Sequence, residues 1–234
     1  MPALPSTFRL GALDLDSLLR NFILLPDITQ TLPMNETLLK LRQAGEAVLR
    51  QPARLLSVDE IRSPEIQRLI AAMRDTLRDA PGVGLAAPQV GFGLSLAIIE
   101  DRAEYQQGVP AGQLAERGRV PVPFQVIVNP VLHITDPTQK LFFEGCLSVA
   151  GFTALIPRAA SVRVEALDGN GESRLIEAEG WFARILQHEV DHLQGKLYLD
   201  AMLPRSFMNA ANHARFWKDS PVCEVCAALG LPQG

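Results

Sequence analysis

The chain has 234 residues, of which 47% are hydrophobic and 21% are charged, and its formal net charge is −4. This length predicts one domain with extensions. The small negative net charge argues against binding to nucleic acids or anionic membranes through overall electrostatic attraction. Three cysteines favour a reducing compartment over a disulfide scaffold, and neither a membrane-spanning run nor a secretory or arginine-rich targeting segment is expected.

The chain is predicted to open with an extension and then a helix of the domain. Residues 1–35 hold leucines spaced for a short amphipathic helix, and residues 36–53 begin the domain. Ser63-Pro64-Glu65 predicts a helix start, because it combines a capping hydroxyl, a proline at the first helical position and an acid in the first turn. Apolar residues follow at helical spacing, and Pro81-Gly82 is expected to end this helix.

A segment of small residues, GVGLAAPQ, occupies positions 82–89. Its glycines and alanines allow the backbone to approach a ligand closely. The lysine and the following serine or threonine of a phosphate-binding loop are absent, so nucleotide binding is not expected. Taken alone, the segment is more typical of a packed turn than of a binding site.

Strands and a long loop are predicted next. The apolar run at 94–99 indicates a buried strand, and a second strand at 126–128 is expected to end at Asn129-Pro130. The polar residues 101–123, which are rich in glycine and proline, predict a long loop at a functional rim or a mobile flap. Alternating residues around Asp-Gly-Asn-Gly predict a β-hairpin within 162–176.

A helix from about residue 178 to residue 196 is predicted to carry the chemistry. His188 and His192 lie four residues apart, on one face of that helix, and can hold one metal ion. Glu189 can reach a water on such an ion. Trp181 and Ile185 share the histidine face, which therefore points to the interior, whereas Arg184 is expected on the other side.

The third metal ligand separates the families that use HExxH. One group of zinc peptidases has a third histidine six residues after the second, but that position is Tyr198. Cys146 is the strongest remaining candidate, because a thiolate would complete a Cys-His-His site with one open position. The Cys-x-x-Cys at 223–226 has no second pair and is expected to be two free thiols in a tail.

Three motifs together resemble those of peptide deformylases. They are GVGLAAPQ at 82–89, EGCLS at 144–148 and QHEVDHLQG at 187–195, in the order and spacing of that family. The resemblance covers about residues 40–205, and GWFARIL at 180–186 is similar to the type 1 enzymes of bacteria and organelles. It implies an α+β fold with small β-sheets packed around a central helix that carries HExxH.

The resemblance implies a metal-dependent hydrolase that removes the N-formyl group from N-formylmethionine of nascent polypeptides and releases formate. It implies one ion per chain, Fe²⁺ ahead of Zn²⁺, Ni²⁺ or Co²⁺, in the cytoplasm of a bacterium rather than in an organelle. Formylated nascent chains are the expected partners, with the ribosome surface as a further candidate and no role for nucleic acids or membranes. The implied catalytic domain is 36–204, between an extension at 1–35 and a tail at 205–234.

The resemblance also implies a role for each residue of the centre. Glu189 would take a proton from the attacking water and give it to the leaving amine. The Gln89 side-chain amide and the backbone N–H of Leu147 would stabilise the developing oxyanion. The implied metal ligands are Cys146, His188 and His192.

The substrate is implied to bind through backbone and apolar contacts. Gly84 would offer its backbone to an extended peptide, and Trp181 and Ile185 are candidates for the wall of a methionine pocket. Leu85, together with the leucine after the cysteine ligand, would lie at the rim. Thr153 stands where some bacterial relatives carry an arginine, so contacts beyond the methionine are expected to differ.

Two other functions compete with deformylation. A zinc endopeptidase would use the same Glu189 but would not need Cys146. A binding or regulatory protein that kept the scaffold and lost turnover would be expected to lack a ligand, Glu189 or Gln89, and none of these is missing.

Overall fold

The computed structural model describes residues 38–232, so the predicted extension at 1–35 lies outside the described residues. Its helices are α2 (Val58–Arg62), α3 (Pro64–Asp79), α4 (Ala111–Arg117), α5 (Gly180–Leu193), α6 (Ala210–Phe216) and α7 (Val222–Leu229). Its strands are β1 (Gly84–Ala86), β2 (Leu96–Asp101), β3 (Val122–Gly145), β4 (Phe152–Leu167), β5 (Ser173–Glu179) and β6 (Met208–Asn209). Short 3₁₀ helices are η1 (Ala47–Arg50), η2 (Ala87–Val90), η3 (Ala103–Gln106), η4 (Tyr198–Asp200) and η5 (Pro204–Ser206).

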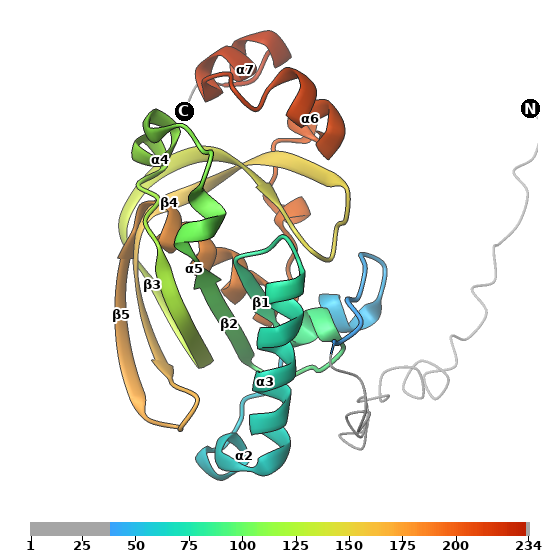
Figure 1. Ribbon diagram of the computed structural model, residues 1–234, viewed down its shortest axis with the longest axis vertical. Coiled ribbons are helices and arrows are strands. Elements are labelled where there is room, and N and C mark those ends of the chain that lie inside the picture. Colours follow the sequence, from blue (N-terminus) through green and yellow to red (C-terminus); the bar gives the residue numbers. More distant parts are fainter. Residues whose placement is uncertain (1–37, 233–234) are drawn as a thin grey trace, which may run out of the picture. The chain divides into compact units, whose positions relative to one another are not determined.

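The strands form one antiparallel sheet in the order β1-β2-β3-β4-β5, with β6 added to β4 (Figure 1). The long strands β3 and β4 pair from Val128 opposite Leu167 to Gly145 opposite Thr153. The predicted α+β class is confirmed. Within residues 38–232 the strands form a single six-stranded sheet rather than the several small sheets that were expected.

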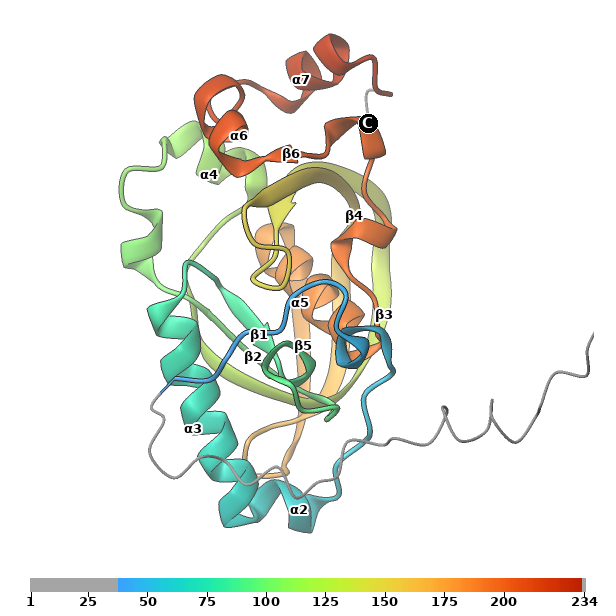
Figure 2. The ribbon, with the colours of Figure 1, turned by 90° about the vertical axis from the view of Figure 1, so that its right-hand side faces the viewer.

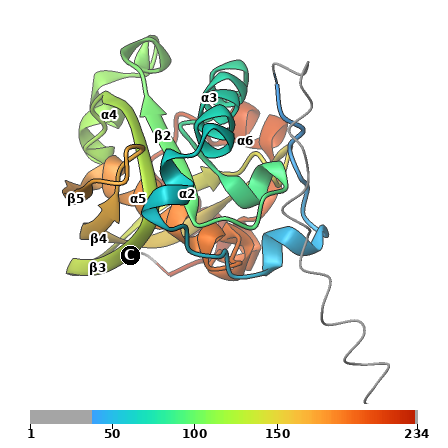
Figure 3. The same ribbon diagram turned by 90° about the horizontal axis from the view of Figure 1, so that it is seen from below.

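Strand β2 is buried on both faces because a helix covers each one. Leu96 and Ile98 pack in the hydrophobic cluster that contains the apolar face of α3, whereas Ile99 packs in the cluster that contains Ile185 and Leu186 of α5. Figure 3 shows β2 between the two helices. Each fully buried leucine or isoleucine contributes about 1.5–3 kcal/mol, so the first cluster holds α3 and the second holds α5 against the sheet.

Helix α3 begins as its sequence predicts. The Ser63 hydroxyl accepts a hydrogen bond from the N–H of Ile66 at 3.3 Å, and Pro64 is the first helical residue. The apolar face is buried, and the helix ends before Pro81. The predicted β-hairpin is also confirmed, with Asp168 accepting hydrogen bonds from two backbone N–H groups of the turn.

The prediction that a strand ends at Asn129-Pro130 was wrong, because β3 runs through both residues. A register shift between Val128 and Val131 takes the proline out of the regular pairing, as a β-bulge allows. Asn129 has a φ of 52°, and its side chain exchanges hydrogen bonds of 3.0 and 2.8 Å with the backbone of Leu56. The bulge therefore ties β3 to the segment before α2.

The segment 101–123, expected to be a long loop, contains η3 and α4. Its return to the sheet is held by Arg119, which donates two hydrogen bonds of 2.8 and 2.9 Å to the buried carboxylate of Asp101. The expectation of a loop without helices was therefore wrong, because a buried ion pair orders the segment.

The C-terminal residues up to 232, expected to be a tail, are folded onto the sheet. Strand β6 pairs with β4, and α7 buries Val225 and Cys226 against Leu155. Cys223 is exposed, and all three cysteines of the chain are free thiols. No helix among the described residues combines the length and apolar character needed to cross a membrane.

Candidate functional site

Helix α5 presents His188 and Glu189 of HExxH to a cavity of about 650 Å³, whereas His192 is buried and does not line it. The helix contacts η2 and five strands of the sheet, from β1 to β5 (Figure 2). It ends at Leu193 with Gln194 as its C-cap, and Gly195 follows with a φ of 73°, a left-handed conformation that suits a glycine after a helix. The helix therefore has little freedom to turn, and the side chains that it carries have fixed directions.

Three potential metal ligands converge at the base of the cavity. Cys146 follows the last residue of β3, and its Sγ lies 3.3 Å from Nε2 of His192. Nε2 of His192 lies 3.2 Å from Nε2 of His188, and the three ligand atoms are within 4.8 Å of one another. One thiol and two imidazoles are a donor set that Fe²⁺ and Zn²⁺ both accept.

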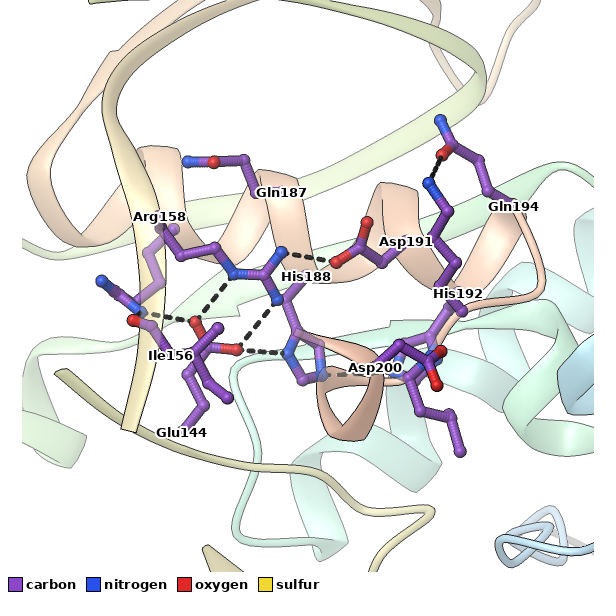
Figure 4. Close-up of polar contacts among 12 residues, drawn as sticks. Glu144, Ile156, Arg158, Gln187, His188, Asp191, His192, Gln194 and Asp200 are labelled. Carbon is purple, nitrogen blue, oxygen red and sulfur yellow. Dashed lines mark hydrogen bonds and ion pairs between the residues drawn. The ribbon is translucent and has the colours of Figure 1, made fainter. Parts of the chain in front are cut away.

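The orientation of His188 is set by a buried carboxylate. Nδ1 of His188 lies 3.0 Å from Oε2 of Glu144 (Figure 4). An Nδ1–H that donates to this carboxylate leaves the lone pair of Nε2 directed at the other two ligands. Two imidazole lone pairs at 3.2 Å repel each other unless a proton or a cation lies between them, so the arrangement fits a bound cation.

Glu144 is the centre of an ion-pair network that sequence reasoning missed. Arg158 donates two hydrogen bonds of 3.0 Å to its carboxylate, and Arg184 donates one of 2.6 Å (Figure 4 shows the Arg158 contacts). Burial alone would raise the pKa of Glu144, but His188 and Arg158 hold that pKa well below its usual value. Glu144 therefore stays ionised and keeps His188 in place. The only sequence signal for this network was an acidic residue two positions before the cysteine in EGCLS.

Arg184 was predicted on the side of the helix away from the histidines, and this prediction was wrong. It is 3% exposed, donates to Glu144 and to the carbonyl of Ile156, and lines the cavity. Helical periodicity places charged residues on the solvent side, but here a buried acid from β3 binds the guanidinium.

The two histidines have pKa values that are shifted in opposite directions. Burial would lower the pKa of His188, but Cys146 and Glu144 beside it raise that pKa well above its usual value. Burial, followed by the charge on His188, lowers the pKa of His192 well below its usual value. The opposite directions follow from the closeness of the two imidazoles, because a positive charge on His188 disfavours a second one on His192.

Glu189 lies beside this centre with one unpaired carboxylate oxygen. Its Oε2 is buried and has no hydrogen-bond partner among residues 38–232. Burial raises the pKa of Glu189 to about 7. The carboxylate fits because Gly84 of β1 has no side chain: a Cβ there would lie 2.1 Å from Oε1 of Glu189.

Gln89 of η2 directs its side-chain NH₂ group into the centre. Its Oε1 accepts a hydrogen bond from the N–H of Ala86 at 2.8 Å, which identifies the oxygen because a backbone N–H can only donate. Its Nε2 lies 3.4 Å from Sγ of Cys146 and 3.3 Å from Oγ of Ser148. The buried small residues of GVGLAAPQ thus serve to bring an amide close to the ligands.

The cavity collects most of the predicted site residues. In addition to the residues described above, Leu147, Trp181 and Ile185 line it. Leu85 does not: its side chain is fully buried in the cluster beneath α3, so its predicted place at the rim was wrong. Side chains alternate along a strand, and Leu85 therefore points away from the face to which Gly84 belongs.

A family model described as polypeptide deformylase matches residues 38–207 of the chain. The chain belongs to this family. Peptide deformylase 1A of tomato chloroplasts (Solanum lycopersicum) is 44% identical over 189 residues, which are 81% of this chain and 66% of that protein. Peptide deformylase 3 of Streptomyces avermitilis is 46% identical over 188 residues, which are 80% of this chain and 82% of that protein.

Solved structures of deformylases share the fold. The class I type b peptide deformylase of Acinetobacter baumannii with bound Met-Ala-Ser is 32% identical, with a TM-score of 0.62 over 70% of this chain and 98% of that chain. Deformylases are metal-dependent enzymes that remove the N-formyl group from nascent polypeptides, and the chain is a hydrolase of this family. Similar deformylases come from bacteria, chloroplasts and mitochondria.

Proposed function

We propose that the cavity binds the N-formylmethionine end of a nascent polypeptide and that Cys146, His188 and His192 hold one divalent ion at its base. Fe²⁺ is the proposed ion, ahead of Zn²⁺, Ni²⁺ and Co²⁺. When bound, such an ion supplies Lewis acidity, which makes a water nucleophilic near neutral pH. The observation that carries the proposal is the convergence of three ligand atoms within 4.8 Å of one another, beside an unpaired buried carboxylate.

Glu189 is proposed as the group that moves the proton. Its unpaired Oε2 is available to accept a proton from the attacking water and to deliver it to the amine nitrogen as the formyl C–N bond breaks. A positioned base and acid of this kind contributes about 10²–10⁴-fold to the rate. Gly84 keeps the carboxylate within the cavity, because no side chain at that position displaces it.

Gln89 and Leu147 are proposed to stabilise the negative charge that develops on the formyl oxygen. The NH₂ group of Gln89 already points at the ligands, and the carbonyl of Leu147 is held by a hydrogen bond of 3.0 Å from Gln43. Each donor of an oxyanion site contributes about 2.7–4 kcal/mol. Both are proposed to act without moving, because the residues around them are packed.

The methionine side chain is proposed to lie against Trp181 and Ile185, and the peptide backbone against Gly84. The Acinetobacter baumannii enzyme binds Met-Ala-Ser, a peptide that begins with methionine, which supports the same substrate class for this chain. We place the reaction in the bacterial cytoplasm, on chains that emerge from the ribosome.

The test is anaerobic release of formate from formyl-Met-Ala, with the metal content measured in the same samples. We expect the wild type to release formate, and Glu189→Gln to keep its metal while losing about 10²–10⁴-fold in kcat. The exposed Glu165→Gln is the matched control and should retain full activity. Metal-loaded wild type that releases no formate would contradict the proposal.

An endopeptidase is the alternative that Cys146→Ser tests. A deformylase that needs the thiolate should lose metal and activity together in this variant. Full activity with intact metal, and cleavage at internal peptide bonds, would favour the endopeptidase.

A further inference from the structure

A second cavity, of about 500 Å³, lies between α4 and the C-terminal segment that contains α6 and α7. Figure 1 and Figure 2 both show α4 at the same end of the molecule as these two helices. The side-chain amide of Gln113 donates a hydrogen bond of 3.1 Å to the carbonyl of Lys218, which links the two walls. The lining residues within 213–222 lie beyond residue 207, where the family match ends, so membership of the family assigns this cavity no role.

Packing fixes both walls of the cavity. Helix α4 ends at Arg117, and a Cβ on Gly180, the first residue of α5, would lie 2.9 Å from the carbonyl oxygen of Arg117. On the other side, Trp217 and Val222 pack against the buried cluster that contains Leu155 of β4. The cavity is therefore part of the packed fold rather than a gap between loose segments.

Arg117 brings a positive charge to this cavity without an acidic partner. Its guanidinium carbon lies 5.3 Å from the ring centroid of Trp181 and 5.9 Å from that of Phe142, and it forms no ion pair among residues 38–232. A guanidinium that stacks on aromatic rings through its face keeps the N–H donors at its edge available. Burial and the charge of Arg119 lower the pKa of Arg117, with only the exposed Glu116 acting in the other direction.

The remaining lining combines a histidine with aromatic rings. The ring of His213, on α6, lies 4.4 Å from that of Phe143, and Trp217 lines the same cavity. His213 forms no side-chain hydrogen bond among the described residues, so its ring N–H is available to a ligand. The acid Asp219 lies 3.9 Å from Lys218, and both of these side chains are largely exposed. The interior therefore offers a fixed guanidinium beside apolar walls.

We propose that this cavity binds a small carboxylate that carries an aromatic ring. The planar guanidinium of Arg117 can hold a carboxylate through two parallel N–H···O bonds, while Phe143 and Trp217 contact the ring. A volume of about 500 Å³ lies within the range of small-molecule sites. The site does not depend on the proposed deformylation, although Phe143 lines both cavities.

The experiment is an NMR titration of the full chain with 3-phenylpropionate, after chelation and dialysis have removed any metal that could bind the carboxylate. We expect saturable binding of one molecule per chain with a Kd of about 1 mM or lower. Acetate and 3-phenylpropionamide should bind at least about tenfold more weakly, because each lacks one of the two recognised groups. Arg117→Met should weaken binding of the acid by about tenfold or more and leave the amide unchanged, whereas Arg117→Lys should keep part of the preference.

Arg215→Met is the matched control, because Arg215 also lies beside an aromatic ring, that of Phe216 at 4.9 Å, but does not line the cavity. It should bind the acid as the wild type does. Ala150→Glu adds a negative charge at an exposed position that lines the catalytic cavity and not the second one, and it should also leave binding unchanged.

Three outcomes would overturn this site. They are the absence of saturable binding, equal affinity for the acid and the amide, and binding of the acid that survives Arg117→Met. Loss of binding in Ala150→Glu would place the probe in the catalytic cavity and would also contradict the proposal. Thermal melting of each variant shows that it is folded, and Arg117→Lys supplies the result if Arg117→Met does not fold.

Discussion

At the scale of single residues, the site depends on Gly84, because this position has no side chain. Gly84 lies against the carboxylate of Glu189, and a Cβ at that position would approach Oε1 to 2.1 Å and the adjacent carboxyl carbon to 2.6 Å. No atom pair tolerates such distances, so Glu189 would have to turn away. The glycine thus determines where the Glu189 carboxylate lies, which is the group that we propose to transfer the proton.

Gly84→Ala is therefore expected to lower kcat/KM for formyl-Met-Ala by about a hundredfold, the usual cost of a displacement of about 1 Å in a catalytic group. Metal content and melting temperature should change little, because the three atoms nearest to the added Cβ all belong to Glu189. Gly93→Ala is the matched control, since a Cβ there would meet no atom within 4 Å. Formate release, metal analysis and thermal melting test this prediction. An unchanged kcat/KM would show that the position of the Glu189 carboxylate does not require a glycine at residue 84.

Sequence patterns located the chemical groups of the site better than its supporting residues. Motif spacing brought His188, Glu189 and Cys146 together, and the structure places them around one cavity. Arg184 and Leu85 were misplaced, because periodicity reports which face is apolar and contains no information about a buried partner from another strand. Sequence alone could not reveal the buried ion pairs of Glu144, since its partners come from β4 and α5.

At the scale of elements, α3 is joined to β2 by an ion pair as well as by apolar contacts. Arg78 donates hydrogen bonds of 2.7 and 2.8 Å to Glu100, whose side chain is largely buried. The hydrogen bond from Arg78 lowers the pKa of Glu100. Because this pKa is lower in the folded chain than in the unfolded one, the ion pair stabilises the fold above about pH 4.3.

Glu100→Gln should lower the free energy of unfolding by about 1–2 kcal/mol at pH 7, a value reduced for the partly exposed Arg78. The difference from the wild type should shrink as the pH falls below about 4.3 and through the folded pKa, because the wild-type carboxylate is then protonated too. Urea unfolding at a series of pH values measures it. Glu104→Gln, an exposed acid 3.9 Å from Arg102, should show no such dependence. An effect of Glu100→Gln that is constant with pH would contradict the explanation.

Elements that depend on local sequence were predictable, and those that depend on distant partners were not. Helix α3 carries its own cap and its own apolar face, so its start was predicted correctly. The course of β3 through Asn129 depends on Leu56, and the folding of α7 depends on Leu155. Neither partner is near in sequence, which is why a strand end and a tail were predicted there.

At the scale of the whole molecule, the proposed metal centre links two distant parts of the fold. Cys146 comes from the connection between β3 and β4, and the two histidines come from α5. A ligand that binds only the folded chain stabilises it by about 2.7 kcal/mol at a concentration a hundred times its Kd. The centre is therefore expected to contribute to stability as well as to catalysis.

Removal of the metal with a chelator should lower the melting temperature by about 5–10 °C, since about 1 kcal/mol shifts it by 2–4 °C in a chain of this size. Adding Fe²⁺ anaerobically, or Zn²⁺, should restore it. Cys146→Ser should melt at the lower temperature under both conditions, whereas Cys223→Ser, which removes an exposed thiol, should respond as the wild type does. Identical melting of the chelated and loaded wild type would mean that the ion does not link these parts.

Because the proposed ligands are far apart in the sequence, they are synthesised at different times during translation. Cys146 and His192 are 46 residues apart. At about 5–20 residues per second, the cysteine is polymerised about 2–9 s before the second histidine exists. During that interval the new copy carries a thiol with no ligand set around it, open to any oxidant in its surroundings. If Cys146 is the proposed ligand, the speed of translation and the redox state of the compartment are expected to affect how many copies keep it reduced.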